Sequence, residues 1–259
     1  MASDLFKIQA GEFMITAKVA FITGANRGIG FETARELAEK GIHVVIGARN
    51  PEEGIAAAQK LRDKRLFADS IVFDVTNSEH HIEAAKYFEE KFGKLDILVN
   101  NAGIMLTAED DRANNTSSTS ENNLRKTFDV NFFAPVALTQ KLLPLIKKSS
   151  SGRIVNLSSI LGSLSMHADP KSSIYNSKIF AYNASKSALN AFTIHLAHEL
   201  CNTSIKVNSA HPGWVKTAMG GKAAPMEVKD GAATSVRLAL LPDDGPTGGF
   251  FHQNERLPW

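Results

Sequence analysis

Cysteine and long apolar runs are both nearly absent from this sequence, and each absence narrows what the chain can be. Cys201 is the single cysteine among 259 residues, which excludes an internal disulfide and is typical of a reducing compartment. No apolar run reaches the roughly 18 residues that a membrane-spanning helix needs. The first residues hold no apolar block of the kind found in secretory signals. We therefore predict a cytoplasmic protein with no membrane segment.

An excess of charge of either sign is also missing. The chain has 29 Lys and Arg against 27 Asp and Glu, a net charge of +2, and no dense basic run, so we expect no nucleic-acid partner. Hydrophobic residues make up 43% and charged residues 22%, which is enough apolar material for a folded domain. The N-x-S/T sequons at Asn114 and Asn183 are expected to be chance matches, because no secretory signal accompanies them.

Short β-branched runs alternate with helical patterns along the chain. Strands are expected at 18–23, 43–48, 70–75, 95–103, 152–159, 204–213 and 248–251. Helices are expected at 28–40, 51–63, 78–93, 124–147 and 181–200. Such alternation favours a parallel sheet covered on both faces. We predict an α/β fold, a doubly wound parallel sheet (Rossmann fold) of about seven strands, as one domain over 1–259 with an N-terminal extension at 1–17.

A glycine-rich loop, TGANRGIG at residues 23–30, separates the first expected strand from the first expected helix. Gly24 can make the tight turn out of the strand, Gly28 can let a pyrophosphate approach the backbone, and Gly30 can let helix and strand pack closely. The free N–H groups of the helix N-terminus favour phosphates. In this position the loop predicts a dinucleotide site rather than a glycine-rich turn without a ligand.

The residues after the second expected strand indicate which dinucleotide binds. An acid about 20 residues past the glycines would bind the ribose 2′-hydroxyl of NAD, but positions 47–49, which end 19 residues after Gly30, hold none. Arg49 can instead pair with a 2′-phosphate, and Arg27 can reach the same group. We predict NADPH over NADH; the alternative is that both arginines are solvated surface residues.

Two tyrosine–lysine pairs compete for an acid–base role. A phenol with a pKa of about 10 gives up its proton poorly at neutral pH, and a nearby ammonium lowers that pKa. Tyr182 and Lys186 are four residues apart on a strongly helical pattern, so they share a helix face. Tyr175 and Lys178 follow loop-forming residues, and a lysine near the helix start opposes the helix dipole. We predict that Tyr182 and Lys186 do the chemistry, and that the other pair shapes the pocket rim.

Four motifs in this order resemble the short-chain dehydrogenase/reductase family: the glycine loop, NNAG at 100–103, the Tyr182–Lys186 spacing and HPGWVKT at 211–217. The resemblance covers the chain from Lys18 onward and implies a nicotinamide-dependent oxidoreductase. Ser159 matches the family's catalytic serine before an xxG turn, while Ser158 faces the other side of the strand. Asn131 matches the family's helix asparagine.

The resemblance implies three sets of site residues. The catalytic set is Asn131, Ser159, Tyr182 and Lys186. The cofactor set is Gly24, Asn26, Arg27, Gly28, Ile29, Gly30, Arg49, Asp74, Val75, Asn101, Ala102, Gly103, Tyr182, Lys186, Pro212, Gly213, Val215 and Thr217. The substrate set is Ser159, Tyr182, Trp214 and Met219. Asp74 has an alternative as a strand-end cap.

No metal is expected, although a histidine-rich motif occurs near residue 200. His195, His198 and Glu199 form H-x-x-H-E, which matches neither H-E-x-x-H nor H-x-x-E-H. His80 and His81, at the start of an expected helix, are given no role.

The implied mechanism is carbonyl reduction. NADPH supplies a hydride, Tyr182 the proton, and Ser159 orients the carbonyl oxygen. Lys186 lowers the tyrosine pKa and binds the nicotinamide ribose. Asn131 anchors a water chain, because Pro135 lacks the N–H that would bond the Asn131 carbonyl in an α-helix. The alternative for Asn131 is a local hydrogen bond within its helix.

The interval from Ser159 to Tyr182 is 23 residues, longer than is common in the family. We expect its segment 163–181 to wall the substrate site, and 214–230 to form a mobile lid. The segments 131–147 and 229–259 resemble those of carbonyl reductases, which implies a small-molecule aldehyde or ketone as substrate. The alternatives are a dehydrogenase oxidising a secondary alcohol, steroid or polyol, and a non-catalytic NADPH sensor. A homodimer or homotetramer is expected, with a monomer left open.

Overall fold

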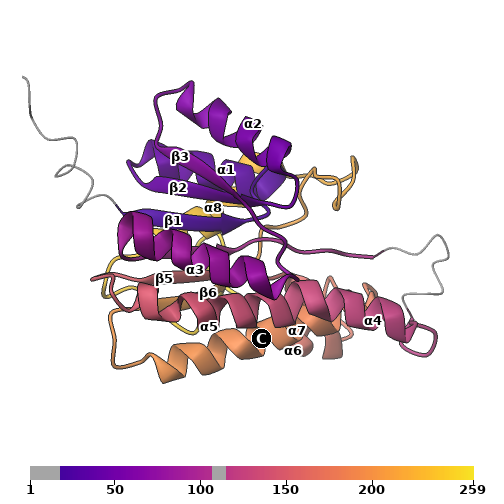
Figure 1. Cartoon of the computed structure of the whole chain (residues 1–259). Helices are drawn as coiled ribbons and strands as arrows, with labels where there is room; N and C mark the ends of the chain where they lie inside the picture. The colour runs from indigo at the N-terminus through magenta and orange to yellow at the C-terminus, as the bar shows by residue number, and fades with distance from the viewer. Residues whose placement is uncertain (1–17, 107–114) are drawn as a thin grey trace, which may run out of the picture.

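One mixed sheet forms the centre of the computed structural model, which describes residues 18–106 and 115–259 (Figure 1). The strand order is β3-β2-β1-β4-β5-β6-β7-β8, parallel up to β7 and antiparallel between β7 and β8. The strands are β1 Val19–Thr23, β2 His43–Ala48, β3 Ala68–Val72, β4 Ile97–Asn100, β5 Arg153–Leu157, β6 Lys206–Ala210, β7 Phe250–His252 and β8 Glu255–Arg256. The extension predicted at 1–17 lies outside the described residues.

This order confirms the predicted doubly wound sheet, with two differences. The short antiparallel β8 was not predicted. The third strand ends at Val72, three residues before the predicted end, because only the Phe73 N–H continues the ladder, to the Ala48 carbonyl at 2.8 Å. The strand order reverses between β1 and β4, and in open α/β sheets ligands bind at such a switch point, outside the carboxyl ends of the strands.

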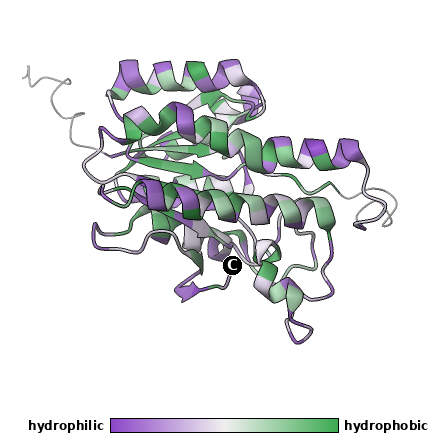
Figure 2. Ribbon diagram, turned by 90° about the horizontal axis from the view of Figure 1, so that it is seen from below, coloured by the Kyte–Doolittle hydropathy of each residue, from purple (hydrophilic) through white to green (hydrophobic). Residues whose placement is uncertain are grey.

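Helices cover both faces of the sheet, as the apolar strands require. They are α1 Gly28–Glu39, α2 Pro51–Arg62, α3 Ser78–Phe92, α4 Glu121–Phe128, α5 Ala134–Ile146, α6 Leu164–Ala168, α7 Phe180–Glu199 and α8 Val228–Ala239. One core layer holds side chains of α1, α2 and α8, and the other those of α3, α5 and α7. The strands between these layers are mostly green in Figure 2, and all five residues of β1 are buried.

Local signals start and stop these helices. Asn50 caps α2 by accepting the Glu53 N–H at 3.0 Å, and Pro51 is its first residue. The helix α3 begins at Ser78 as predicted, and Asn77 caps it by accepting the Glu79 N–H at 3.0 Å. None of the helices within the described ranges is long and apolar enough to cross a membrane.

The long helix predicted at 124–147 contains a wider turn than the sequence suggested. Between α4 and α5, Asp129–Phe133 is a π-helix, and the Ala134 N–H donates to the Asp129 carbonyl five residues back. The prediction of a free Asn131 carbonyl assumed α-helical spacing to Pro135. The π-type bond from the Ala134 N–H belongs to the Asp129 carbonyl, so the free Asn131 carbonyl stays a prediction.

Candidate active site

The glycine loop makes the turn that its spacing suggested. Gly24 has a φ of +64° and Gly28 a φ of +59°, conformations that favour glycine. A Cβ on Gly30 would lie 2.4 Å from the Asn101 side-chain nitrogen, so only glycine lets the helix approach. A Cβ on Gly28 would meet nothing closer than Thr217 Cγ2 at 3.8 Å, which leaves open space above the backbone. The loop has the room that a phosphate group requires.

Thr23, which the sequence analysis missed, ties this loop to the 101–103 loop. Its Oγ1 accepts the N–H groups of Asn101 and Ala102 at 3.1 and 3.0 Å. In return the Asn101 side chain donates to the carbonyls of Thr23 and Gly24 at 2.7 and 3.2 Å. The two loops, from β1 and β4, therefore form one hydrogen-bonded unit at the switch point.

Asp74 sits in a turn just past β3. Its Oδ1 accepts the N–H and the hydroxyl of Thr76 at 2.9 and 2.8 Å, which agrees with the predicted capping alternative and leaves Oδ2 free of any hydrogen bond within the described residues. Burial raises the pKa of Asp74, but the two Thr76 bonds, Arg49 and His80 outweigh it and lower the pKa. The carboxyl group is thus ionised at neutral pH.

Two histidines without a predicted role hold this turn in place. His80 Nδ1 accepts the Asp74 N–H at 2.8 Å. His81, which is buried, bonds the Val75 carbonyl through Nε2 at 2.8 Å and stacks on Phe73.

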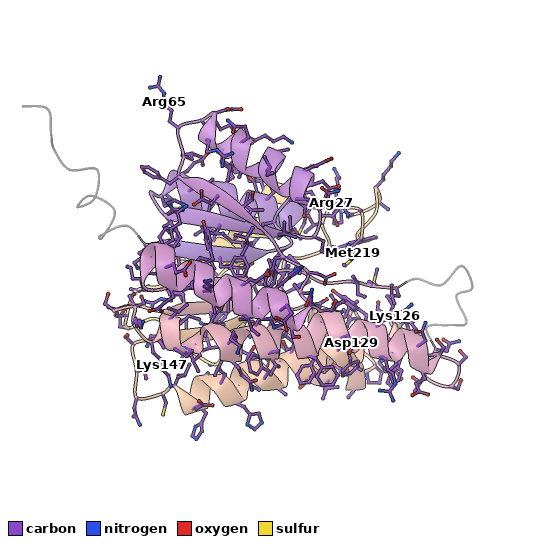
Figure 3. The ribbon with its side chains drawn as sticks, in the orientation of Figure 1. Arg27, Arg65, Lys126, Asp129, Lys147 and Met219 are labelled. Carbon is purple, nitrogen blue, oxygen red and sulfur yellow. The ribbon has the colours of Figure 1, made fainter. Side chains whose placement is uncertain are left out.

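Arg27 and Arg49 are both exposed beside the glycine loop. Arg27 precedes α1 and lies at the same edge of the molecule as Met219, opposite Arg65 (Figure 3). Within 18–106 and 115–259, neither Arg27 nor Arg49 forms an ion pair within 4.0 Å, so both guanidinium groups are available to an anion. Asn26 is held by Glu53 at 2.5 Å.

Tyr182 and Lys186 lie one turn apart on α7 and are both buried. The Lys186 Nζ is 5.7 Å from the centre of the Tyr182 ring and donates to the Leu157 carbonyl at 2.7 Å. The Ser159 side chain lies near enough to the Tyr182 hydroxyl to lower its pKa, and its Oγ accepts the Leu161 N–H at 3.2 Å. The structure therefore brings the end of β5 and the face of α7 together, with all three predicted groups in one cluster.

Burial dominates the electrostatics of this cluster. It raises the pKa of Tyr182, and nearby Ser159 acts in the opposite direction. Burial lowers the pKa of Lys186 to about 8. The net pKa of Tyr182 is therefore raised, because desolvation of the phenolate dominates while the Lys186 Nζ bonds the Leu157 carbonyl. That Lys186 favours the phenolate during the reaction stays a prediction.

The turn after Ser159 packs directly on α7. A Cβ on Gly162 would lie 2.8 Å from the Lys186 carbonyl carbon, so the turn needs glycine there. Ser158 faces away as expected, with its Oγ donating to Asn190 Oδ1 at 2.6 Å. This contact places Ser159, and not Ser158, beside Tyr182.

Asn131 is fully buried where the π-turn meets the 101–106 loop. Its Oδ1 accepts the Ile104 N–H at 2.8 Å, and its Nδ2 donates to the Ile104 carbonyl at 2.8 Å and to Ser185 Oγ at 3.0 Å. A Cβ on Gly103 would meet Asn131 Oδ1 at 3.3 Å and Lys186 Nζ at 3.5 Å. The asparagine thus bonds across elements, not within its own helix as the alternative held.

Tyr175 and Lys178 form a separate pair before α7 begins. The Lys178 Nζ lies 4.7 Å from the centre of the Tyr175 ring and donates to the His167 carbonyl at 2.9 Å and to its Nδ1 at 3.2 Å. His167 in turn reaches the Leu161 carbonyl at 3.0 Å. The pair is anchored to α6 and the serine turn, and it is not on the face of Tyr182 and Lys186.

The predicted lid, 214–230, crosses the same edge of the sheet as a loop and the start of α8. Val215 and Met226 form a parallel bridge, and the Trp214 indole donates to the Gly220 carbonyl at 2.8 Å. Trp214 is 57% exposed and Met219 41% exposed. The inner part of the loop is therefore tied down, with Val215 and Ala224 buried, while Trp214 and Met219 are exposed.

The histidine-rich motif shows no metal geometry. Among the described residues, no group of three or more His, Cys, Asp or Glu side chains could hold a metal ion. His195 and Glu199 instead line a groove between α5 and α7.

Comparison with known proteins relates the chain to a family of oxidoreductases. A sequence profile described as short chain dehydrogenase matches residues 18–228. The chain is 32% identical to (-)-isopiperitenone reductase of Mentha piperita and 32% identical to carbonyl reductase [NADPH] 1 of Mus musculus, over 93% of this chain and 98% of each relative. The crystal structure of NADPH-bound carbonyl reductase from chicken fatty liver has a TM-score of 0.80 and 27% identity, covering 94% of this chain and 99% of that one.

Proposed function

The chain belongs to the short-chain dehydrogenase family, and on that premise we propose that it reduces aldehydes or ketones to alcohols with NADPH. The observation that carries the proposal is the burial of Tyr182 and Lys186 on one face of α7, with Ser159 near enough to the tyrosine to act on its pKa. A proton donor, a group to orient a carbonyl and a buried cation are what carbonyl reduction asks of a protein.

The glycine loop and the two exposed arginines support NADPH as the cofactor. Gly28 leaves open space for the pyrophosphate, and Arg27 and Arg49 offer unpaired guanidinium groups for a 2′-phosphate. Asp74 and the 101–103 loop would border the adenine and the adjoining ribose. A mouse relative and a chicken structural neighbour carry NADPH in their names, which agrees with this choice.

Each residue of the cluster has a defined task in the proposed reaction. Bound NADPH supplies the hydride to the carbonyl carbon. Burial raises the pKa of Tyr182, so the tyrosine holds its proton in the resting site, and it donates that proton to the carbonyl oxygen as negative charge develops there. Ser159 orients that oxygen by a second hydrogen bond. Lys186, with a pKa of about 8, stays mainly charged at pH 7 and stabilises the phenolate that donation leaves behind.

Asn131 acts through the loop that it holds. Its amide fixes Ile104 by two hydrogen bonds, which holds the neighbouring Gly103 where an added Cβ would lie 3.5 Å from the Lys186 Nζ. Gly103 has no side chain to block the space next to Lys186. We propose that this space admits the water through which Lys186 recovers protons.

The residues around the cluster favour an apolar carbonyl as substrate. Four of the large hydrophobic side chains that are exposed lie on the segments flanking the site: Leu164, Tyr175, Trp214 and Met219. Exposed apolar groups gathered near a polar cluster are typical of a site that binds an apolar molecule and orients it by few polar contacts. The other functions considered, oxidation of an alcohol and NADPH sensing, have no separate feature of the described residues in their favour.

The decisive experiment removes the phenolic hydroxyl. We expect Tyr182→Phe to lose at least about 1000-fold in kcat with a panel of apolar aldehydes and ketones, since general acid catalysis contributes about 100- to 10,000-fold. NADPH affinity, measured by fluorescence titration, should stay within about threefold. Tyr175→Phe is the matched control and should keep near-normal turnover. Turnover retained in Tyr182→Phe, or lost equally in both variants, would refute the assignment.

A further inference from the structure

The hydrogen-bond ladder between β5 and β6 stops at the active site. In a parallel pair, N–H groups of the two strands donate alternately. Here the Lys206 N–H donates to the Gly152 carbonyl at one end, and the Ser158 N–H donates to the Ala210 carbonyl at the other. The next donor in this alternation is residue 212, which is a proline and has no N–H. The main chains beyond Ser158 and Ala210 therefore need another link.

The His211 side chain supplies that link. Its Nδ1 accepts the Ile160 N–H at 3.2 Å and also lies 3.4 Å from the Gly213 N–H. Ile160 directly follows Ser159, and Gly213 has a φ of +85° in the loop predicted to meet the cofactor. One imidazole nitrogen thus joins the turn that carries the serine to the turn that carries Pro212 and Gly213.

The surroundings of His211 keep this nitrogen an acceptor. Burial, together with the neighbouring His252, lowers the pKa of His211 to about 3, so the ring is neutral at every physiological pH. The His252 ring centre lies 4.9 Å from that of His211, and His252 Nδ1 is 3.0 Å from the His211 carbonyl. The His211 N–H donates to the Phe251 carbonyl at 2.7 Å. Side chain and main chain of this residue are both held.

We propose that His211 is a positioning residue, whose neutral imidazole holds the Ser159 turn in register with the Pro212–Gly213 turn and so sets the serine against the bound cofactor. The expected effect on turnover rests on the proposed function. The hydrogen-bonded link between the two turns does not depend on that function. Small displacements of an orienting group cost large factors in rate, about 100-fold for 1 Å.

Two substitutions separate positioning from packing. His211→Leu keeps the approximate volume but removes the acceptor, whereas His211→Asn retains a side-chain oxygen that can accept the Ile160 N–H. We expect His211→Leu to lower kcat by about 10- to 100-fold with the carbonyl KM and the NADPH Kd within about threefold of wild type, and His211→Asn to recover most of the loss. His198→Leu, at an exposed histidine near the end of α7, makes the same replacement away from both turns and should retain wild-type kcat.

Amide hydrogen exchange gives a readout that does not depend on turnover. The Ile160 and Gly213 amides should exchange faster in His211→Leu than in wild type, and His211→Asn should restore protection at Ile160. Wild-type kcat in His211→Leu, or unchanged amide exchange at Ile160 in that variant, would overturn the proposal. If His211→Leu does not fold, an unprotected Ile160 amide in His211→Asn would also overturn it. A wild-type protein that reduces no carbonyl would refute the proposed function, and exchange at Ile160 would still decide the role of His211.

Discussion

At the scale of single residues, burial decides the chemistry of the site more than pairwise charge does. The same desolvation raises the pKa of Tyr182 and lowers that of Lys186. Both shifts favour the uncharged form of each side chain. The tyrosine therefore holds its proton in the resting site, and its loss of that proton depends on stabilisation of the phenolate.

The preference for NADPH over NADH is predicted to depend on a single residue, Arg49. Replacing Arg49 by Asp should lower kcat/KM with NADPH by about 10- to 100-fold, because one charge-assisted hydrogen bond to a phosphate is worth about 1.5–3 kcal/mol. The ratio of NADPH to NADH activity should fall accordingly, since the new carboxylate repels a 2′-phosphate. Steady-state kinetics with both cofactors measure this.

The matched control is Arg65→Asp. Arg65 is equally exposed but lies far from Arg27 (Figure 3), so its replacement changes the net charge by the same amount without touching the site. An unchanged cofactor ratio in Arg49→Asp, or a wild-type preference for NADH, would contradict the 2′-phosphate role.

At the scale of elements, one carboxylate joins β2, β3 and α3 at the end of the sheet opposite the site. Asp69 Oδ2 lies 2.6 Å from His43 Nε2, 3.1 Å from the Tyr87 hydroxyl and 2.7 Å from Lys91 Nζ. The His43 bond lowers the pKa of Asp69 most, burial opposes this, and Lys91 lowers it further, so the pKa lies well below its usual range. The cluster fastens the edge of the sheet that supports the predicted adenine site.

This depressed pKa sets the pH range in which Asp69 stabilises the fold. A carboxyl group whose pKa is lower in the folded state contributes fully above its unfolded pKa of about 3.9 and loses that contribution as the pH falls through the folded value. We expect Asp69→Asn to lower the free energy of unfolding by about 1.5–3 kcal/mol at pH 7. The difference from wild type should shrink below about pH 4. Urea denaturation across this range tests it.

Asp244→Asn, an exposed aspartate in a turn, should leave the unfolding free energy within about 0.5 kcal/mol of wild type. A difference between Asp69→Asn and wild type that persists undiminished at pH 3 would show that lost packing, not lost charge, is the cause.

At the scale of the whole molecule, the face formed by α5 and α7 is the best candidate for self-association. A groove between the two helices is lined by Thr139, Gln140, Leu143, Phe192, His195, Leu196 and Glu199. Ile194 on α7 is 39% exposed, and Phe133, just before α5, is 56% exposed. Apolar side chains beside a groove on two long helices favour pairing with a second copy.

We therefore predict a dimer or tetramer that Ile194→Glu converts towards a monomer, since a charge in an apolar interface is costly. Light scattering after gel filtration measures the mass. Ile55→Glu on α2, which covers the other face of the sheet, is the control and should leave the mass unchanged. Wild-type protein that elutes as a monomer at all concentrations would contradict the prediction.

The amino-acid sequence by itself determined most of the elements, although not all of their ends. Alternating β-branched and amphipathic segments identified the seven parallel strands and five of the helical regions, because local periodicity and strand burial follow directly from residue order. The helices α6 and α8 were not predicted. The two φ-positive glycines, Gly24 and Gly28, do follow from residue order. The spacing of Tyr182 and Lys186 also placed both side chains on one helix face.

Only the tertiary structure decided what surrounds these groups. Lys186 bonds the Leu157 carbonyl, Asn131 bonds Ile104, and His211 bridges two turns, each across at least 27 residues of sequence. The π-turn at Asp129–Phe133 and the raised pKa of Tyr182 belong to the same class. These contacts and the pKa shift depend on which elements pack together and on how much water the packing excludes. Neither the packing nor the exclusion of water is a property of a local stretch of chain.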